Sequence, residues 1–142
     1  MLKVKDIMTE NVISVRKDTP IFQVIEILSD NDITGIPVVG DDMTVVGILS
    51  EKDVLSVLYA PEENEGKVVD DFMTVPAICF EEDESVLEVC NCLRENFFRR
   101  VLVTTHGKLV GIVTRKDIIK CILQGRKKKA DGDQSVIRTA QC

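Results

Sequence analysis

The segment GILSEKD occupies residues 47–53 and recurs as GIVTRKD at residues 111–117. Each copy begins with glycine and two apolar residues, followed by a hydroxyl residue, two polar residues and an aspartate. The apolar residues are typical of the end of a buried strand, and the hydroxyl residue stands where a helix N-cap belongs. We therefore expect each copy to join a strand directly to the first turn of a helix.

Outside these segments, the chain divides into two repeats. The tetrapeptide DIMT at residues 6–9 matches DFMT at residues 71–74, at nearly the same offset as the two longer segments. Internal repetition indicates units that bury their apolar faces against each other. We expect a first repeat at residues 1–60, a linker at 61–67 and a second repeat at 68–124, related by a pseudo-two-fold axis.

Apolar periodicity predicts the order strand, helix, strand, strand, helix in each repeat, which is an α/β fold. In the first repeat the elements are expected at residues 12–15, 21–31, 36–39, 45–49 and 51–59. In the second repeat they are expected at residues 77–80, 85–95, 100–104 and 109–113, followed by a final helix that ends near Gly125. In helix 51–59 we expect Val54, Leu55 and Leu58 to face inward. The polar residues 125–142 lack this periodicity and are predicted to be disordered.

The composition argues against several classes of function. The hydrophobic fraction of 44% supports a packed core, whereas the aromatic fraction of 4%, without tryptophan, disfavours stacking on single-stranded nucleic acid. The net charge of −6 disfavours binding to duplex DNA. No apolar run approaches the roughly 20 residues that span a bilayer, and charges at Lys3, Lys5 and Asp6 leave no apolar core for a signal peptide. We therefore expect a cytoplasmic protein that binds neither nucleic acid nor membrane.

Charge is unevenly distributed along the chain. Residues 1–66 contain 13 acidic and 5 basic residues, whereas residues 67–142 contain 11 acidic and 13 basic residues. An anionic ligand is therefore expected to bind through side chains of the second half. The five cysteines are irregularly spaced without a C-x-x-C pair, and the single histidine, His106, has no motif partner. We expect no metal site, no catalytic residue and no enzymatic activity.

The repeated segment has two interpretations that the sequence leaves open. In the first, Ser50 and Asp53 form a capping box that satisfies free amides at a helix start. In the second, Gly47 lets a ligand approach the backbone closely, the hydroxyl and the helix N-terminus attract a phosphate, and the aspartate accepts hydrogen bonds from vicinal ribose hydroxyls. A carboxylate that caps a helix can also bind ribose, so the two interpretations are compatible.

These patterns together resemble a known family. The doubled element order, the D-x-M-T openings, the GIPV strand at residues 35–38 and both G-x-x-[ST]-x-x-D segments are similar to a tandem pair of CBS (cystathionine β-synthase) domains, or Bateman module. The resemblance covers residues 4–123. It implies two repeats packed sheet to sheet, which bind AMP, ADP, ATP or S-adenosylmethionine in clefts between them, form homodimers and regulate a partner protein in trans. It implies no required cofactor, with Mg²⁺ expected only as a companion of ATP.

The resemblance also assigns site residues position by position. A first ligand site is expected to contain Ile48, Ser50, Asp53, Ala77, Ile78, Phe98, Arg99 and Arg100. A second site is expected to contain Asn11, Ile13, Ile33, Thr34, Gly35, Ile112, Thr114 and Asp117. Thr34 and Gly35 stand where the first site has its two arginines. Because arginine binds phosphate through charge-assisted hydrogen bonds, we expect the first site to prefer phosphorylated nucleotides.

Two other functions stay open at this point. A structural dimerisation or interaction module with vestigial clefts would carry the same Ser-x-x-Asp and Thr-x-x-Asp pairs as helix caps. An enzyme would require a nucleophile with its base or a metal set, and the sequence motifs supply neither.

Overall fold

The structure, a computed structural model, describes residues 2–96 and 98–130, with side chains described up to residue 127. The chain folds into two compact units. The central unit is Ile13–Ala77, and the terminal unit combines residues 2–12 with the residues from Ile78 onward. The D-x-M-T segment at residues 6–9, which opens the first repeat, therefore lies in the unit that contains the final helix of the second repeat. The segment at residues 71–74, which opens the second repeat, lies in the unit that contains the final helix of the first repeat. The boundaries of the units differ for this reason from those of the sequence repeats.

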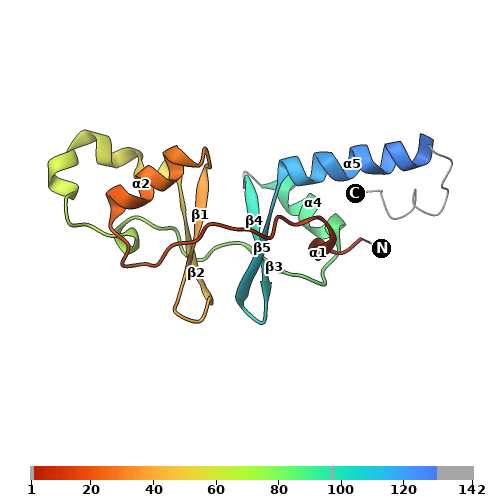
Figure 1. The fold of residues 1–142 in the computed structure, drawn as a ribbon, viewed down its shortest axis with the longest axis horizontal. Coiled ribbons are helices and arrows are strands. Elements are labelled where there is room, and N and C mark those ends of the chain that lie inside the picture. The colour runs from red at the N-terminus through yellow and green to blue at the C-terminus, as the bar shows by residue number, and fades with distance from the viewer. Residues whose placement is uncertain (1, 97, 131–142) are drawn as a thin grey trace. The chain divides into compact units, whose positions relative to one another are not determined.

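The central unit contains a two-stranded antiparallel sheet with α2 beside it (Figure 1). Its elements are α2 (Ile21–Asp30), β1 (Gly35–Val39), β2 (Val45–Ser50), α3 (Glu51–Val54) and the 3₁₀ helices η1 (Leu55–Tyr59), η2 (Pro61–Asn64) and η3 (Val69–Asp71). Every residue of β1 is buried, which explains its uninterrupted apolar sequence. The core cluster includes Ile21, Val24 and Leu28 of α2 with Ile36, Val38 and Leu49 of the sheet.

The terminal unit is built on a three-stranded sheet in the order β3-β4-β5. Its elements are α1 (Val4–Ile7), β3 (Cys79–Glu81), α4 (Val86–Glu95), β4 (Arg100–Thr105), β5 (Lys108–Thr114) and α5 (Arg115–Ala130). Strand β3 runs parallel to β4 and reaches it through α4, whereas β4 and β5 form an antiparallel hairpin. The hairpin turns at His106 and Gly107, which have φ angles of 52° and 80°. Positive φ at both positions is what a two-residue type I′ turn requires.

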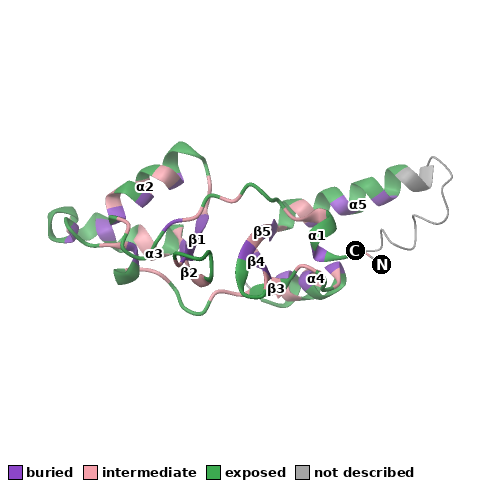
Figure 2. Ribbon diagram, turned by 60° about the horizontal axis from the view of Figure 1, so that its bottom comes forward, coloured by how far each residue is buried: buried purple, intermediate pink, exposed green. Residues whose placement is uncertain are grey.

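The core of the terminal unit joins α1, α4 and the strands. Buried residues gather on the strands and on the inner side of the helices (Figure 2). The cluster contains Val4, Val86, Val89, Leu93, Val101, Val103, Val113 and Ile118. Helix α4 begins at an N-cap, because the Ser85 hydroxyl accepts a hydrogen bond from the Leu87 amide at 3.1 Å. Burial at three- and four-residue spacing explains why the predicted helix 85–95 is confirmed.

The first strand of the first repeat differs from the prediction at residues 12–15. Only Val15 pairs there, through a parallel bridge to Val38. Val12 instead donates its amide to the carbonyl oxygen of Glu10, two residues back, and Ile13 is exposed. A local turn therefore takes the place of the expected ladder.

The final helices of both repeats also differ from the prediction. The expected helix 51–59 ends as α3 at Val54 and continues as η1, where Leu55 and Leu58 are exposed and Val57 is buried. The prediction of inward-facing Leu55 and Leu58 was wrong, because a 3₁₀ helix has three residues per turn and presents a different face. Helix α5 runs on to Ala130, so the prediction of disorder was wrong for residues 125–130, and residues 131–142 lie outside the described residues. No helix in the described part of the chain combines the length and the apolar composition needed to cross a bilayer.

Candidate functional site

The repeated segment holds its aspartate in the same way in both units. In the central unit, Asp53 Oδ2 accepts hydrogen bonds from the amide of Ser50 at 2.9 Å and from its hydroxyl at 3.1 Å. In the terminal unit, Asp117 Oδ2 accepts the equivalent bonds from Thr114 at 2.8 and 3.2 Å. The carboxylate thus reaches back to the N-cap residue, as in half of a capping box. The Ser50 hydroxyl donates its hydrogen bond to the carboxylate.

A threonine from the D-x-M-T segment donates a third hydrogen bond to each carboxylate. The Thr74 hydroxyl donates to Asp53 Oδ1 at 3.0 Å, and the Thr9 hydroxyl donates to Asp117 Oδ1 at 3.3 Å. The sequence interpretation missed both threonines as site residues. Their signal was present, because each repeat opens with the same tetrapeptide and only its fourth residue carries a hydroxyl.

Backbone pairing fixes these threonines beside the segment. The amide of Thr74 donates to the Ile48 carbonyl at 2.8 Å, and the Ile48 amide donates to the Thr74 carbonyl at 3.0 Å. Thr9 and Ile112 exchange the same two bonds at 2.9 and 3.0 Å. Ile48 and Ile112, both predicted as site residues, therefore use their backbone groups to anchor a crossing segment of chain.

This crossing explains the two glycines of the repeated segment. A Cβ on Gly47 would lie 2.7 Å from the carbonyl oxygen of Thr74. A Cβ on Gly111 would overlap the Met8 sulfur and would lie 3.1 Å from the carbonyl oxygen of Thr9. The interpretation that these glycines admit a ligand was wrong, because the D-x-M-T segment occupies the space that the missing side chains leave.

Around Asp53, the central unit gathers several further predicted residues. Gly35 is the register partner of Ser50, and the Thr34 carbonyl accepts a hydrogen bond from the Glu51 amide at 3.0 Å. Ile33 packs against the central core. The other predicted residues of this unit are Ile13, which is exposed, and Ala77, which is half-buried.

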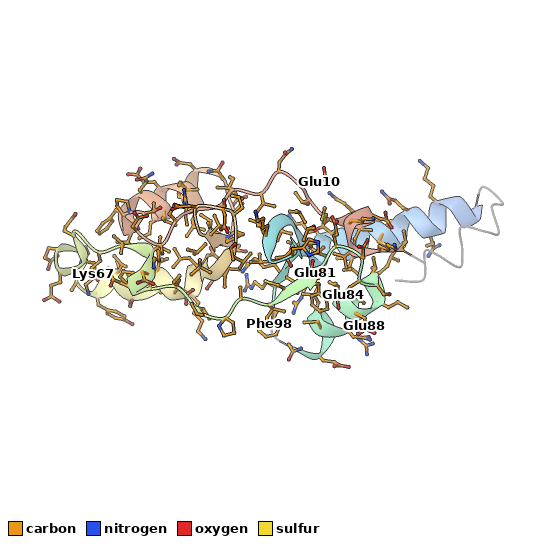
Figure 3. All side chains as sticks on the ribbon, turned by 90° about the horizontal axis from the view of Figure 1, so that it is seen from below. Glu10, Lys67, Glu81, Glu84, Glu88 and Phe98 are labelled. Atoms are coloured by element: carbon orange, nitrogen blue, oxygen red, sulfur yellow. The ribbon has the colours of Figure 1, made fainter. Side chains whose placement is uncertain are left out.

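Around Asp117, the terminal unit gathers a basic group. Arg100 is the register partner of Thr114, and Arg99 and Phe98 precede it in exposed positions. The Phe98 side chain is labelled in Figure 3. Arg115 donates to the Phe98 carbonyl at 3.4 Å. The remaining predicted residues of this unit are Ile78, whose carbonyl accepts from the Leu102 amide at 2.9 Å, and Asn11, which is exposed.

Each of the two predicted sets of site residues is thus divided between the two units. Ile48, Ser50, Asp53 and Ala77 of the first set belong to the central unit, and Ile78, Phe98, Arg99 and Arg100 belong to the terminal unit. The second set is divided likewise, with Ile13, Ile33, Thr34 and Gly35 in the central unit and Asn11, Ile112, Thr114 and Asp117 in the terminal unit. Each complete set stays a prediction. Among the described residues, no three histidine, cysteine, aspartate or glutamate side chains are grouped as metal ligands.

The sequence matches the family described as CBS domain twice, over residues 4–60 and 69–124. It is 34% identical over 119 residues to the uncharacterised protein MJ1225 of Methanocaldococcus jannaschii. That match covers 84% of this chain and 42% of the relative, so the chain spans less than half of that protein. It also spans 63% of the chloroplastic CBS domain-containing protein CBSX2 of Arabidopsis thaliana, with 28% identity over 151 residues.

Two solved structures resemble the chain closely. The crystal structure of CBSX2 in complex with AMP is 32% identical, covers 87% of this chain and 98% of its own, and superposes with a TM-score of 0.80. The CBS domain pair of protein MJ0100, in complex with 5′-methylthioadenosine and S-adenosyl-L-methionine, is 29% identical. It covers 89% of this chain and 98% of its own, with a TM-score of 0.74.

Proposed function

Because the chain belongs to the CBS domain family and carries the domain twice, we propose that it is a regulatory module that binds an adenosine-containing ligand. The ligands named for the two similar structures are AMP, 5′-methylthioadenosine and S-adenosyl-L-methionine. These molecules differ at the 5′ position and share adenine and a ribose with two vicinal hydroxyls. A module that accepts this class of ligand therefore needs a group that binds the ribose.

The observation that carries the proposal is the repeated geometry of Asp53 and Asp117. Each carboxylate accepts two hydrogen bonds at Oδ2 and one at Oδ1 from its own unit. An ionised carboxylate offers about four acceptor positions, so one position is left for a ligand hydroxyl. The three bonds hold the carboxylate in one orientation before a ligand arrives, which lowers the entropy cost of binding.

We assign the 5′ end of the ligand to residues that differ between the two predicted sets. In the first set, a phosphate on a ligand held by Asp53 is bound by Arg99 and Arg100. In the second set, a ligand held by Asp117 meets Thr34 and Gly35, which bring no positive charge. The first set is therefore expected to favour AMP or ATP, with Mg²⁺ accompanying ATP, and the second set to favour a less charged adenosine derivative.

A second candidate function is a structural interaction module with no ligand. It is favoured by the fact that Ser50 and Thr74 already give Asp53 three hydrogen bonds, so the carboxylate has a structural role without a nucleotide. In either function the output is exerted on a partner protein or through self-association. The two candidates differ in whether Asp53 meets a ligand.

Isothermal titration calorimetry separates the two candidates. The purified chain is titrated with AMP, ATP with and without Mg²⁺, and S-adenosylmethionine, and GMP serves as a control that keeps the ribose phosphate and changes the base. Saturable heat with an adenine ligand, lost in the Asp53→Asn and Asp117→Asn variants, supports the sensor. Absence of heat and of thermal stabilisation with every ligand would favour the structural module.

A further inference from the structure

Residues 2–9 lie against the terminal unit, and we call them the strap. The amide of Val4 donates to the Glu84 carbonyl at 2.8 Å, and the amide of Lys5 donates to the Glu82 carbonyl at 3.0 Å. Helix α1, which lies within the strap, packs beside α4 and α5 (Figure 1). The strap is therefore held to elements of the second repeat, although it belongs to the first repeat in the sequence.

Burial holds the strap less firmly than it holds the sheet. Val4 is buried in the core of the terminal unit, and the other residues of the strap are half-buried or exposed. Lys3 and Lys5 form ion pairs with Asp83 at 3.7 and 3.2 Å, but exposed ion pairs contribute little to stability. By contrast, residues 101–104 of β4 are all buried. Segments with few buried contacts open at a lower free energy than the core, so the strap can open while the sheet stays folded.

The strap reaches the candidate ligand site through Thr9. Oδ2 of Asp117 accepts its two hydrogen bonds from Thr114, whereas Oδ1 accepts its bond from the hydroxyl of Thr9. The backbone of Thr9 is paired with Ile112, two residues before Thr114. Opening of the strap removes the bond to Oδ1, which leaves Asp117 less well oriented to accept hydrogen bonds from a ligand.

Residues 68–74 occupy the equivalent position in the central unit and provide a comparison. The amide of Val69 donates to the Thr19 carbonyl at 3.0 Å, and Val69 is fully buried. Helix η2 shortly precedes this segment, and its buried Asn64 donates to the Ala60 carbonyl at 2.8 Å. This contact ties the start of residues 68–74 to the rest of the central unit. We therefore expect residues 68–74 to open only when the whole central unit unfolds.

We propose that the strap is a regulatory segment controlled by the ligand: a ligand held by Asp117 keeps the strap closed, and the strap opens locally when the ligand leaves. This proposal rests on the proposed function, because it takes Asp117 to be a ligand-binding residue. A ligand shifts such an equilibrium only by its difference in affinity for the two states, and the bond from Thr9 to Asp117 supplies that difference. Opening uncovers Val4 and the core beneath it, so ligand occupancy becomes a change of surface.

Amide hydrogen exchange of the full chain, followed by NMR in increasing urea, tests local opening without a ligand. The amides of Val4, Lys5 and Thr9 report on the strap, and the amide of Leu102, which donates to the Ile78 carbonyl, reports on the sheet. We expect the strap amides to exchange together, at least about tenfold faster than Leu102 in the absence of urea. Exchange of the strap amides at the rate of Leu102, at every urea concentration, would overturn the proposal.

The same exchange experiment with 5′-methylthioadenosine, the less charged ligand expected at Asp117, tests the control by ligand. Exchange of Leu102 reports binding itself, because a ligand of the folded chain slows any exchange that requires global unfolding. At about 100 times the dissociation constant, a ligand that requires the closed strap slows the strap amides by up to about 100-fold as well. Slowing of Leu102 alone means that the ligand ignores the strap, and it overturns the inference. Slowing of neither contradicts the proposed function and the inference with it.

A pair of valine variants separates opening of the strap from general stability. Val4→Ala shortens the buried side chain of the strap, and Val101→Ala makes the same change at an equally buried valine of β4. We expect Val4→Ala to speed exchange of the strap amides about tenfold. Val101→Ala is expected to speed exchange of Leu102 and to leave the strap amides unchanged. Equal acceleration of the strap amides by both variants would show that the strap does not open by itself.

The link between the strap and Asp117 is tested by Thr9→Val, which removes the hydroxyl and keeps the backbone pairing. Each variant is compared with the wild-type chain at the same fractional saturation with 5′-methylthioadenosine. In Thr9→Val the ligand is expected to slow the strap amides less than about threefold, because it no longer distinguishes the closed strap from the open one. Thr44→Val, an exposed threonine of the central unit, is the matched control and keeps the full slowing. Full slowing in Thr9→Val contradicts the proposal.

Discussion

The hydroxyl of Thr74 donates a hydrogen bond to Oδ1 of Asp53 at 3.0 Å, across 21 positions of the chain. The same bond joins Thr9 to Asp117 at 3.3 Å. The threonine that opens one repeat therefore orients the aspartate that closes the other. At each aspartate carboxylate, the D-x-M-T segment and the G-x-x-[ST]-x-x-D segment therefore both donate hydrogen bonds.

The Thr74→Val substitution tests this relationship, because it keeps the shape of the side chain and removes the hydroxyl. We expect a loss of about 0.5–1.5 kcal/mol in the free energy of unfolding, since one hydrogen bond to a partly buried carboxylate is lost. We also expect weaker AMP binding, because Asp53 loses one of its three restraints. Chemical denaturation and calorimetry measure the two effects. Thr44→Val, at an exposed position of the central unit, is the matched control and is expected to change neither.

The Gly47→Ala substitution tests the crossing of the D-x-M-T segment. The new Cβ would lie 2.7 Å from a backbone oxygen, so we expect destabilisation of about 1–3 kcal/mol. Gly111→Ala is expected to cost less, because its closest contact is the flexible end of Met8. Gly40→Ala is the control, since its closest contact would be an ordinary 3.6 Å. Equal midpoints of urea denaturation for all three variants would refute this account of the glycines.

The Arg99→Gln substitution tests the assignment of the ligand phosphate. A charge-assisted hydrogen bond contributes about 1.5–3 kcal/mol, so we expect AMP affinity to fall roughly tenfold or more. Binding of 5′-methylthioadenosine, which carries no phosphate, should change little. Arg94→Gln removes an exposed arginine from α4 and serves as the control. An equal loss for both ligands would mean that Arg99 does not contact the phosphate.

The Lys5–Asp83 ion pair makes a pH-dependent contribution to the stability of the terminal unit. A hydrogen bond and the charge of Lys5 lower the pKa of Asp83 below its usual 3.8, and Asp83 in turn raises the pKa of Lys5 above 10.5. Because folding lowers the pKa of Asp83, its carboxylate stabilises the folded unit above pH 3.8, and this stabilisation is lost as the pH falls below that value. The raised pKa of Lys5 means that its contribution is present below pH 10.5 and is lost at higher pH.

Asp83→Asn should therefore lower the melting temperature slightly at pH 7 and leave it unchanged at pH 2.5. Thermal denaturation followed by circular dichroism measures the difference. The effect is small because both side chains are exposed to solvent. Asp70→Asn, at an exposed aspartate of the central unit, is the control for loss of a surface charge. A difference of equal size at both pH values would show that the ion pair contributes nothing.

Elements with strong local signals were predictable from the sequence. Strand β1 is an unbroken apolar run, α2 carries buried residues at helical spacing, and the Asp53 motif at the end of β2 marks the junction to α3. These features depend on residues close together in the chain. The resemblance to the CBS domain pair was confirmed for the same reason, because it rests on such local motifs repeated in a fixed order.

Features that depend on distant contacts were not predictable. A repeat shows which positions are equivalent, but it does not show that Thr74 contacts Asp53 of the preceding repeat. The glycine at residue 47 was misinterpreted for the same reason, since its neighbour lies 27 positions later in the chain. The exposure of Leu58 was missed because the sequence gives no sign that α3 tightens into η1.

A cycle that pairs a change in the protein with a change in the ligand tests the central claim most directly. AMP and 2′,3′-dideoxy-AMP are titrated into the wild-type chain and the Asp53→Asn variant, and calorimetry gives four affinities. If Asp53 binds the ribose hydroxyls, the wild-type chain binds 2′,3′-dideoxy-AMP at least roughly tenfold more weakly than AMP. The Asp53→Asn variant then binds both ligands with nearly equal, weak affinity. If the substitution and the removal of the hydroxyls weaken binding additively, or if the wild-type chain binds neither ligand, Asp53 is only a helix cap and the proposed function is contradicted.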